Sequence, residues 1–320
     1  MPYVLVDPHF GTALAHCLNE IPQGRVATCG AIARALGDVR AARSVATWLT
    51  DHPQTPRGHR VVRADGRPVL PRAKEGLARD RVLLTDERVD PTRILSPLPN
   101  IGLLQKLREE QRRLAARVIE QDERSPIELI AGVDVSYQGA EICAAAVSIR
   151  VVDLRPVEIA TVRGRADFPY IPTYLAYRES AGIQAVVRRL SRRPDVLMID
   201  GHGRLHPALF GVACHVGVTL DLPTIGIAKH PLAGRVESSE KRATDAWPVR
   251  IRGQTQGYAW LPPDRSRPIY VSVGHRISLE NALRLARIAT RHGYPEALRI
   301  ADRASREMKR NEKREKGATR

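Results

Sequence analysis

Apolar and polar positions alternate differently in the two parts of the chain. Up to about residue 95, short stretches of helical spacing are separated by turns rich in glycine and proline. This spacing predicts helices over Pro8–Asn19, Ala31–Leu36 and Ala41–Thr50. The last two helices are joined by Gly37–Arg40, so the pattern predicts a helix-turn-helix.

The second part alternates strand-like runs with helical stretches, after a charged amphipathic helix predicted over Leu103–Asp122. Strands are expected at Leu129–Tyr137, Ile142–Val152, Val157–Arg163, Val196–Asp200, Thr224–Ala228 and Ile269–Val273. Helices are expected at Tyr174–Arg192, His206–Leu220 and Ser278–His292. Three antiparallel strands followed by alternating helices and strands predict a mixed sheet flanked by helices. The expected class is α/β, with a ribonuclease H-like fold.

A proline-rich segment separates the two parts. Ser96–Asn100 reads SPLPN, and its prolines break any helix and stiffen the chain. A length of 320 residues also suits two domains better than one. We therefore expect a small helical domain over 1–95, a linker over 96–100 and a larger α/β domain over 101–320.

The charge of the chain favours a polyanionic partner. Lysine and arginine number 51 against 35 acidic residues, which gives a formal net charge of +16. Phosphates neutralised by such side chains release counterions, which is the main source of affinity for nucleic acid. A basic tail at Met308–Lys316 supplies only part of the excess. Nucleic acid is the expected partner, and nothing in the sequence points to an obligate protein partner.

The four cysteines do not form a recognisable metal or disulfide framework. Cys17, Cys29, Cys143 and Cys214 include no CxxC pair and have no histidine at zinc-finger spacing. No apolar run reaches the length of a membrane span. The sequence predicts a soluble, cytoplasmic protein that needs no membrane.

Three carboxylates fall where the predicted sheet would bring them together. Asp134 interrupts an apolar strand, Asp200 ends another, and Glu179 lies near the start of the intervening helix. A carboxylate in such surroundings is costly unless it is paired or binds a cation. Carboxylate oxygens are hard ligands that suit magnesium, with manganese as an alternative. Ordinary ion pairs, Asp134 with Arg150 and Glu179 with Arg178, are the competing interpretation.

The segment that follows Asp200 also carries polar side chains. His202 and His206 could ligate a softer metal, such as zinc. We instead expect the glycines around His202, including Gly203, to allow close approach of a nucleic-acid backbone. His206 is expected to support the site from behind or to contact a phosphate.

Seven motifs in this second part resemble those of endonuclease V, in the same order. They are Gly132–Ser136 (GVDVS), Phe168–Pro172 (FPYIP), Tyr177–Glu179 (YRE), Asp200–Gly203 (DGHG), His206–Pro207 (HP), Pro223–Lys229 (PTIGIAK) and Val271–Ile277 (VSVGHRI). The resemblance spans roughly residues 103–303. It implies a magnesium-dependent nuclease that cuts the second phosphodiester 3′ to deoxyinosine, leaving 3′-hydroxyl and 5′-phosphate ends.

The resemblance also implies roles for particular residues of the catalytic site. Asp134, Glu179 and Asp200 become the metal ligands, and all three are present. His275 becomes a further group near the metal, and Lys229 a cation on the phosphate side.

A second set of roles concerns a wedge that enters the base stack. Pro169, Tyr170, Ile171 and Pro172 resemble this wedge, with Tyr170 filling the gap left by an extruded base. An ordinary core aromatic is the alternative for Tyr170. The chain departs from the family at Thr173, where a glycine usually follows the wedge, and at Ala208–Leu209, which replaces a basic pair.

Residues 10–94 resemble the winged helix-turn-helix DNA-binding domain of O6-alkylguanine-DNA alkyltransferases. The resemblance rests on Ile21–Val26 (IPQGRV), Ala41–Val45 (AARSV), Pro56–Val62 (PRGHRVV) and Leu83–Glu87 (LLTDE). Gly58 occupies the place of the alkyl-accepting cysteine, and thiolate chemistry needs a sulfur there. His59 and Glu87 match the activating pair, and Arg43 matches an arginine that enters the base stack. Cys29 stands in place of a DNA-rotating tyrosine.

Together these features predict a DNA repair endonuclease joined to a non-catalytic, alkyltransferase-like module that binds deaminated or alkylated bases. A non-catalytic damage sensor is one alternative, and the intact carboxylates argue against it. An active alkyltransferase is a second, which Gly58 disfavours. A third keeps the nuclease but directs it to inosine in RNA.

Overall fold

The computed structural model describes residues 8–122, 126–237 and 245–318, with the backbone alone at 311–318. The chain forms two compact units, the first comprising residues 1–110 and 167–172 and the second residues 111–166 and 173–320. The division falls inside a helix that begins just after the expected linker, and the boundary at residues 96–100 stays a prediction. No helix among the described residues is long and apolar enough to cross a membrane.

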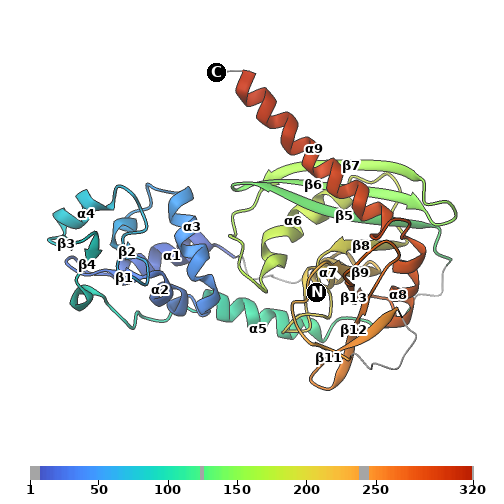
Figure 1. Cartoon of the computed structure of the whole chain (residues 1–320), viewed down its shortest axis with the longest axis horizontal. Coiled ribbons are helices and arrows are strands. Elements are labelled where there is room, and N and C mark those ends of the chain that lie inside the picture. The colour runs from blue at the N-terminus through green and yellow to red at the C-terminus, as the bar shows by residue number, and fades with distance from the viewer. Residues whose placement is uncertain (1–7, 123–125, 238–244, 319–320) are drawn as a thin grey trace. The chain divides into compact units, whose positions relative to one another are not determined.

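The first unit is built mainly from short helices with small β-pairs between them (Figure 1). Its elements are α1 (Phe10–Asn19), β1 (Ala27–Thr28), α2 (Cys29–Ala35), α3 (Ala42–Asp51), β2 (Val61–Val62), α4 (Ala73–Arg79), β3 (Leu84–Thr85) and β4 (Arg88–Val89). The small helical domain predicted from the sequence is confirmed. Thr28 caps α2 by accepting a hydrogen bond from the backbone of Ala31 at 3.0 Å.

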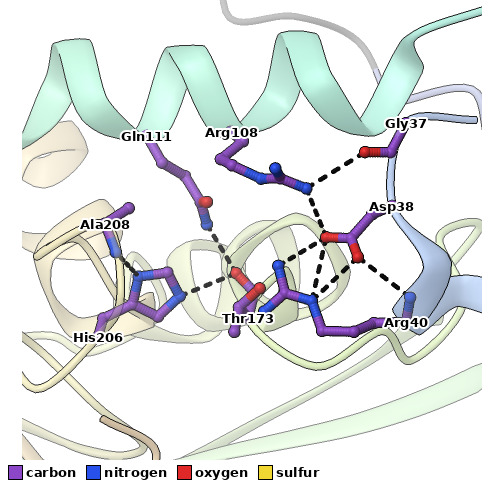
Figure 2. A network of polar contacts seen from close by, with 8 residues as sticks. All are labelled: Gly37, Asp38, Arg40, Arg108, Gln111, Thr173, His206 and Ala208. Carbon is purple, nitrogen blue, oxygen red and sulfur yellow. Dashed lines mark hydrogen bonds and ion pairs between the residues drawn. The ribbon is translucent and has the colours of Figure 1, made fainter. Parts of the chain in front are cut away.

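The turn between α2 and α3 is fixed by a buried carboxylate. Asp38 accepts hydrogen bonds from the backbone and the guanidinium of Arg40, the closest at 2.6 Å (Figure 2). Arg108 also donates to Asp38 at 2.6 Å and to the carbonyl of Gly37. Arg108 lies on α5 (Leu103–Ala115), which ends seven residues before the predicted terminus at Asp122. These charge-assisted bonds hold the helix-turn-helix in one geometry.

The second unit is a mixed sheet with helices on both faces (Figure 1). Within the described residues, nine strands lie in the order β10-β11-β12-β13-β9-β8-β5-β6-β7. They are β5 (Leu129–Gln138), β6 (Glu141–Arg150), β7 (Pro156–Arg165), β8 (Val196–Asp200), β9 (Thr224–Ala228), β10 (Arg235–Val236), β11 (Ala246–Ile251), β12 (Gln254–Trp260) and β13 (Ile269–His275). The helices are α6 (Leu175–Val187), α7 (Val212–Leu220), α8 (Leu279–Ile288) and α9 (Glu296–Ala318).

The alternation of side chains along β5 explains why both faces of the sheet are covered. Ile130 packs into the core under α8 and α9, whereas Ala131 and Val133 pack into the core under α6 and α7. Neighbouring residues of a strand point to opposite faces, so the first five residues of β5, which are all apolar or glycine and buried, need a helical layer on each side. The predicted mixed sheet is therefore confirmed, with β5 parallel to β8.

Three differences from the expected elements have local causes. The hairpin β11–β12 was not foreseen, because its turn, Arg252–Gly253, lacks the usual asparagine or aspartate, although both residues adopt positive φ. The helix expected from His206 begins at Val212, because the preceding residues form an irregular loop. The basic tail continues α9, and side chains beyond residue 310 lie outside the described part.

Candidate active site of the second unit

Two of the three carboxylates lie side by side because of the register between β5 and β8. Val133 pairs with Ile199, so Asp134 and Asp200 occupy the next position on adjacent parallel strands. Glu179 comes from α6, which packs over this part of the sheet. The three side chains are close enough that each of the two aspartates raises the pKa of Glu179.

Asp134 is shielded from water and bonded to α9. Burial, followed by the negative charge of Asp200, raises the pKa of Asp134 to about 6. The hydroxyl of Ser305 donates to Asp134 Oδ2 at 2.8 Å and lowers this pKa, whereas the nearby Asp302 raises it. A protonated or cation-bound carboxyl is therefore favoured at this position.

Glu179 is the most strongly perturbed of the three carboxyls. It is 7% exposed, and burial raises its pKa to about 8. A hydrogen bond from the Tyr137 hydroxyl to Glu179 Oε1 lowers this pKa, and the two aspartates raise it. The guanidinium of Arg178 lies 4.4 Å from the centroid of the Tyr137 ring, and this cation–π contact helps to hold the ring in place.

Lys229 supplies the positive charge at this edge. It follows β9, and its Nζ lies 2.9 Å from Asp200 Oδ2. The same ammonium group lies 4.8 Å from the centroid of the Tyr294 ring. Tyr294 is 7% exposed, and burial together with Asp200 raises the pKa of its hydroxyl well above 10.

This donor set fits a hard divalent cation. Three carboxylates lie in a water-poor site, and two of them have raised pKa values, because burial and mutual repulsion outweigh the positive charges of Lys229 and Arg178. Each is at present held by another side chain, Asp134 by Ser305, Glu179 by Tyr137 and Asp200 by Lys229. No three acid, histidine or cysteine side chains of the described residues are drawn together as a ready-made metal group.

The expectation of ordinary ion pairs is not supported for Asp134. Arg150 instead pairs with Asp153, three residues further along the chain. Asp134 lies on a central strand of the sheet, whereas Arg150 ends β6 at an exposed position. The guanidinium of Arg150 therefore does not stabilise the charge of Asp134.

The structure places His275 at the end of β9 that lies away from Asp200, and its expected role near the metal stays a prediction. This histidine ends β13, which runs antiparallel to β9 and pairs His275 with Thr224, at the start of β9. Asp200 pairs with Ile227 at the other end of β9. His275 instead receives a hydrogen bond from the backbone of Ile119 at Nδ1 and faces Asp221 at 3.4 Å. The strand direction, which the motif does not reveal, separates His275 from the carboxylates.

Four residues of the site were missed. Tyr137, which bonds Glu179, was predicted only as part of a strand. Asp302 and Ser305 approach Asp134 from α9, and Tyr294 lies beside Lys229 and Asp200. Residues 302 and 305 are one helical turn apart and share a face, and this spacing of polar residues was the available signal.

The glycines after Asp200 serve internal packing. A Cβ on Gly203 would lie 2.0 Å from the carbonyl oxygen of Val273, and one on Gly201 would lie 2.5 Å from Val212. The backbone N–H of Gly203 donates to Ser272 Oγ at 3.0 Å. The need for glycine thus comes from the chain itself, and a role of Gly203 in DNA binding stays a prediction.

The predicted wedge belongs to the first compact unit. Tyr170 is 62% exposed, so it is not a core aromatic, whereas Phe168 and Ile171 beside it are buried. Ser44 of α3, in the same unit, donates to the carbonyl of Tyr170 at 2.6 Å. The side chain of Tyr170 is thus displayed on a segment whose neighbours are anchored.

The place of the alkyltransferase nucleophile contains no reactive group. A Cβ on Gly58 would lie 3.2 Å from the side chains of both Leu49 and Leu70. The expected pairing of His59 with Glu87 is not formed, because His59 Nε2 lies 3.0 Å from Asp80 and Glu87 pairs with Lys74.

The thiol of Cys29, in the same unit, is held in its protonated form. Cys29 is buried, which raises its pKa to about 11, so it is a thiol at neutral pH. A cavity of about 530 Å³ nevertheless lies beside His59, and Thr55, Leu70, Pro71 and Arg79 are among the residues that line it. The first unit thus has a cavity large enough for a small group.

Comparison with known proteins assigns both parts of the chain. Residues 112–303 match the family model of endonuclease V. Residues 9–89 match that of the DNA-binding domain of 6-O-methylguanine DNA methyltransferase. Endonuclease V of Thermofilum pendens is 41% identical over 207 residues, which cover 64% of this chain and 88% of that protein.

Solved structures agree with this assignment. The catalytic domain of human endonuclease V shares 34% identity, with a TM-score of 0.61, over 65% of this chain and 96% of that domain. Endonuclease V of Ciona intestinalis, solved with DNA that contains an inosine followed by a ribo-adenosine, shares 25% identity. Its TM-score is 0.59, over 65% of this chain and 98% of that protein.

Proposed function

The chain belongs to the endonuclease V family, and from this premise we propose that it cuts the second phosphodiester 3′ to deoxyinosine in a magnesium-dependent hydrolysis. The observation that carries the proposal is the buried carboxylate set, in which Asp134 and Glu179 have raised pKa values. An enzyme retains such uncompensated acids where a cation is to bind.

Asp134, Glu179 and Asp200 would hold the cation. When bound, magnesium supplies a Lewis acid that polarises the phosphodiester and favours deprotonation of water. The hydroxyl of Ser305 would orient the carboxylate of Asp134, and the hydroxyl of Tyr137 would orient that of Glu179, each by a hydrogen bond. Lys229, which neutralises Asp200 in this structure, would contact a phosphate oxygen of the substrate.

Tyr170 would fill the gap left by an extruded inosine. We expect Tyr170→Ala to lower the ratio of inosine-directed to adenine-directed cleavage by about tenfold, because one stacking contact contributes about 1–3 kcal/mol. Tyr170→Phe retains the ring and should keep the ratio within about twofold. Nicking of paired oligonucleotides that differ in one base measures the effect. An unchanged ratio in Tyr170→Ala would remove the wedge from the proposal.

The first unit would bind damaged duplex without changing it. Its helix-turn-helix and the cavity beside His59 suit a lesion-binding module, and Gly58 supplies no nucleophile. Joined to the nuclease by a short linker, it would make engagement of the DNA partly intramolecular. The module should therefore raise affinity and leave the rate at saturating DNA unchanged.

Arg43 tests the part played by this module. The side chain is exposed on α3. We expect Arg43→Ala to raise the DNA concentration needed for half-maximal nicking by about three- to tenfold and to reduce the salt slope by about one. Arg88→Ala removes an equal charge from β4 and is the control. Equal effects of the two changes across a salt series would mean that general charge, not α3, drives binding.

RNA is the second candidate substrate, because the Ciona relative was solved with a ribo-adenosine next to inosine. The test compares matched DNA and RNA oligonucleotides, with and without inosine, in magnesium. We expect inosine-containing DNA to be cut faster than inosine-containing RNA, since the matched family of the first unit is a DNA-binding one. Faster cleavage of RNA would reassign the substrate.

A further inference from the structure

The residue that follows the wedge segment has an unfavourable backbone conformation. Thr173 has a φ of +74°, in the left-handed region that a β-branched residue rarely occupies. The residue is 9% exposed, so the groups that stabilise this backbone conformation belong to the protein rather than to water. Something nearby must hold this residue in place.

Two buried side chains meet at the carbonyl of Thr173 (Figure 2). Gln111 Nε2 donates to it at 2.8 Å, and His206 Nε2 lies 2.9 Å away. The backbone N–H of Ala208 donates to Nδ1 of the same histidine at 3.1 Å, so Nδ1 is an acceptor and Nε2 carries the proton. Both acceptor positions of the carbonyl are thereby used.

We propose that Gln111 and His206 are positioning residues that fix the left-handed turn at Thr173, the residue that directly follows the wedge segment Pro169–Pro172, and thereby hold the C-terminal end of that segment. The inference rests on the proposed wedge role of Tyr170. All three residues of this clamp lie in the second unit, on α5, before α6 and in the loop after Asp200.

The clamp matters because the strained turn has alternatives. Without its two donors, Thr173 gains by relaxing to negative φ, and the C-terminal end of the wedge segment is then no longer fixed. A wedge that is fixed less firmly fills the gap of an extruded base less often. Cleavage beside inosine then slows, while contacts with the phosphate backbone are unaffected.

A double-mutant cycle tests the inference. Gln111→Met removes one donor at nearly constant length, and we expect the inosine-to-adenine cleavage ratio to fall about fivefold, the equivalent of one net hydrogen bond. Thr173→Gly relieves the strain and should leave the ratio within about twofold. In the Thr173→Gly background, Gln111→Met should cost no more than about twofold, because glycine keeps the turn without the clamp.

The outcomes separate this inference from the function on which it rests. An equal loss for Gln111→Met in both backgrounds would overturn the clamp, as would no loss in either while Tyr170→Ala still lowers the ratio. If Tyr170→Ala itself has no effect, the wedge role fails first. Affinity for undamaged DNA and the unfolding temperature are measured alongside, and Gln111→Asn replaces Gln111→Met if that variant does not fold.

Discussion

Asp134→Asn should abolish strand cleavage, by at least about a thousandfold, because loss of one cation ligand removes several kcal/mol of transition-state stabilisation. Asp200→Asn and Glu179→Gln should behave in the same way. Affinity for inosine-containing DNA should change by less than about threefold, since few phosphate contacts are lost. Single-turnover nicking and a binding titration measure the two quantities on the same oligonucleotide.

Two controls make this expectation specific. Asp153→Asn removes a surface carboxylate that pairs with Arg150 and should leave the rate unchanged. Calcium should support binding without cleavage, because its flexible coordination positions the reacting groups poorly. Near-normal turnover by Asp134→Asn or Asp200→Asn would refute the proposed cation site.

The second large effect is a steep loss of activity in acid when magnesium is limiting. The pKa of Glu179 is raised to about 8 and that of Asp134 to about 6. Both carboxyls must lose a proton before they can ligate a cation. The rate should fall about tenfold per pH unit below 8 and about a hundredfold per unit below 6. Nicking rates from pH 5 to 9 at fixed, subsaturating magnesium measure the slope.

Loss of Tyr137 and an excess of magnesium should move this acid limb in opposite directions. Tyr137 lowers the pKa of Glu179, so Tyr137→Phe should shift the limb to higher pH. Excess magnesium competes with protons and should shift it to lower pH. A limb that ignores the magnesium concentration would show that the titrating groups are not cation ligands.

The raised pKa of Glu179 also makes the free energy of unfolding depend on pH. The pKa of folded Glu179, about 8, exceeds its ordinary value of 4.5, so between these pH values the folded state holds the extra proton. This contribution to the free energy of unfolding is complete below pH 4.5 and is lost as pH rises to 8. Magnesium should therefore raise the unfolding temperature of the wild type more at pH 8 than at pH 6.

The order of helices and strands, and the meeting of Asp134 and Asp200, could be predicted because they depend on the local sequence pattern of each strand. The buried runs at Val196–Asp200 and Thr224–Ala228 became strands at the predicted residues. Asp134 and Asp200 then met because parallel neighbours bring successive strands into register. Glu179 followed from its place near the start of the helix between them.

The rest depended on information that a motif does not carry. The place of His275, at the end of β9 away from Asp200, could not be predicted, because the direction of its strand is set by pairing with β9, which no residue near it specifies. Asp302 and Ser305 were missed because α9 reaches the site only after the sheet has formed. The sequence shows Thr173 as a departure from the family's glycine, but not the left-handed turn there. The two residues that bond its carbonyl, Gln111 and His206, lie 62 and 33 positions away along the chain.

The central claim is that the buried carboxylates direct magnesium-dependent hydrolysis next to inosine. It is tested most directly by mapping the ends of a labelled duplex that contains one inosine, after a single turnover with and without magnesium. We expect one cut, at the second phosphodiester 3′ to the inosine, which leaves 3′-hydroxyl and 5′-phosphate ends. We expect no cut without magnesium, and none by the Asp134→Asn variant. Equal cleavage of a matched duplex that has adenine in place of inosine, or cleavage by the Asp134→Asn variant, would contradict this claim.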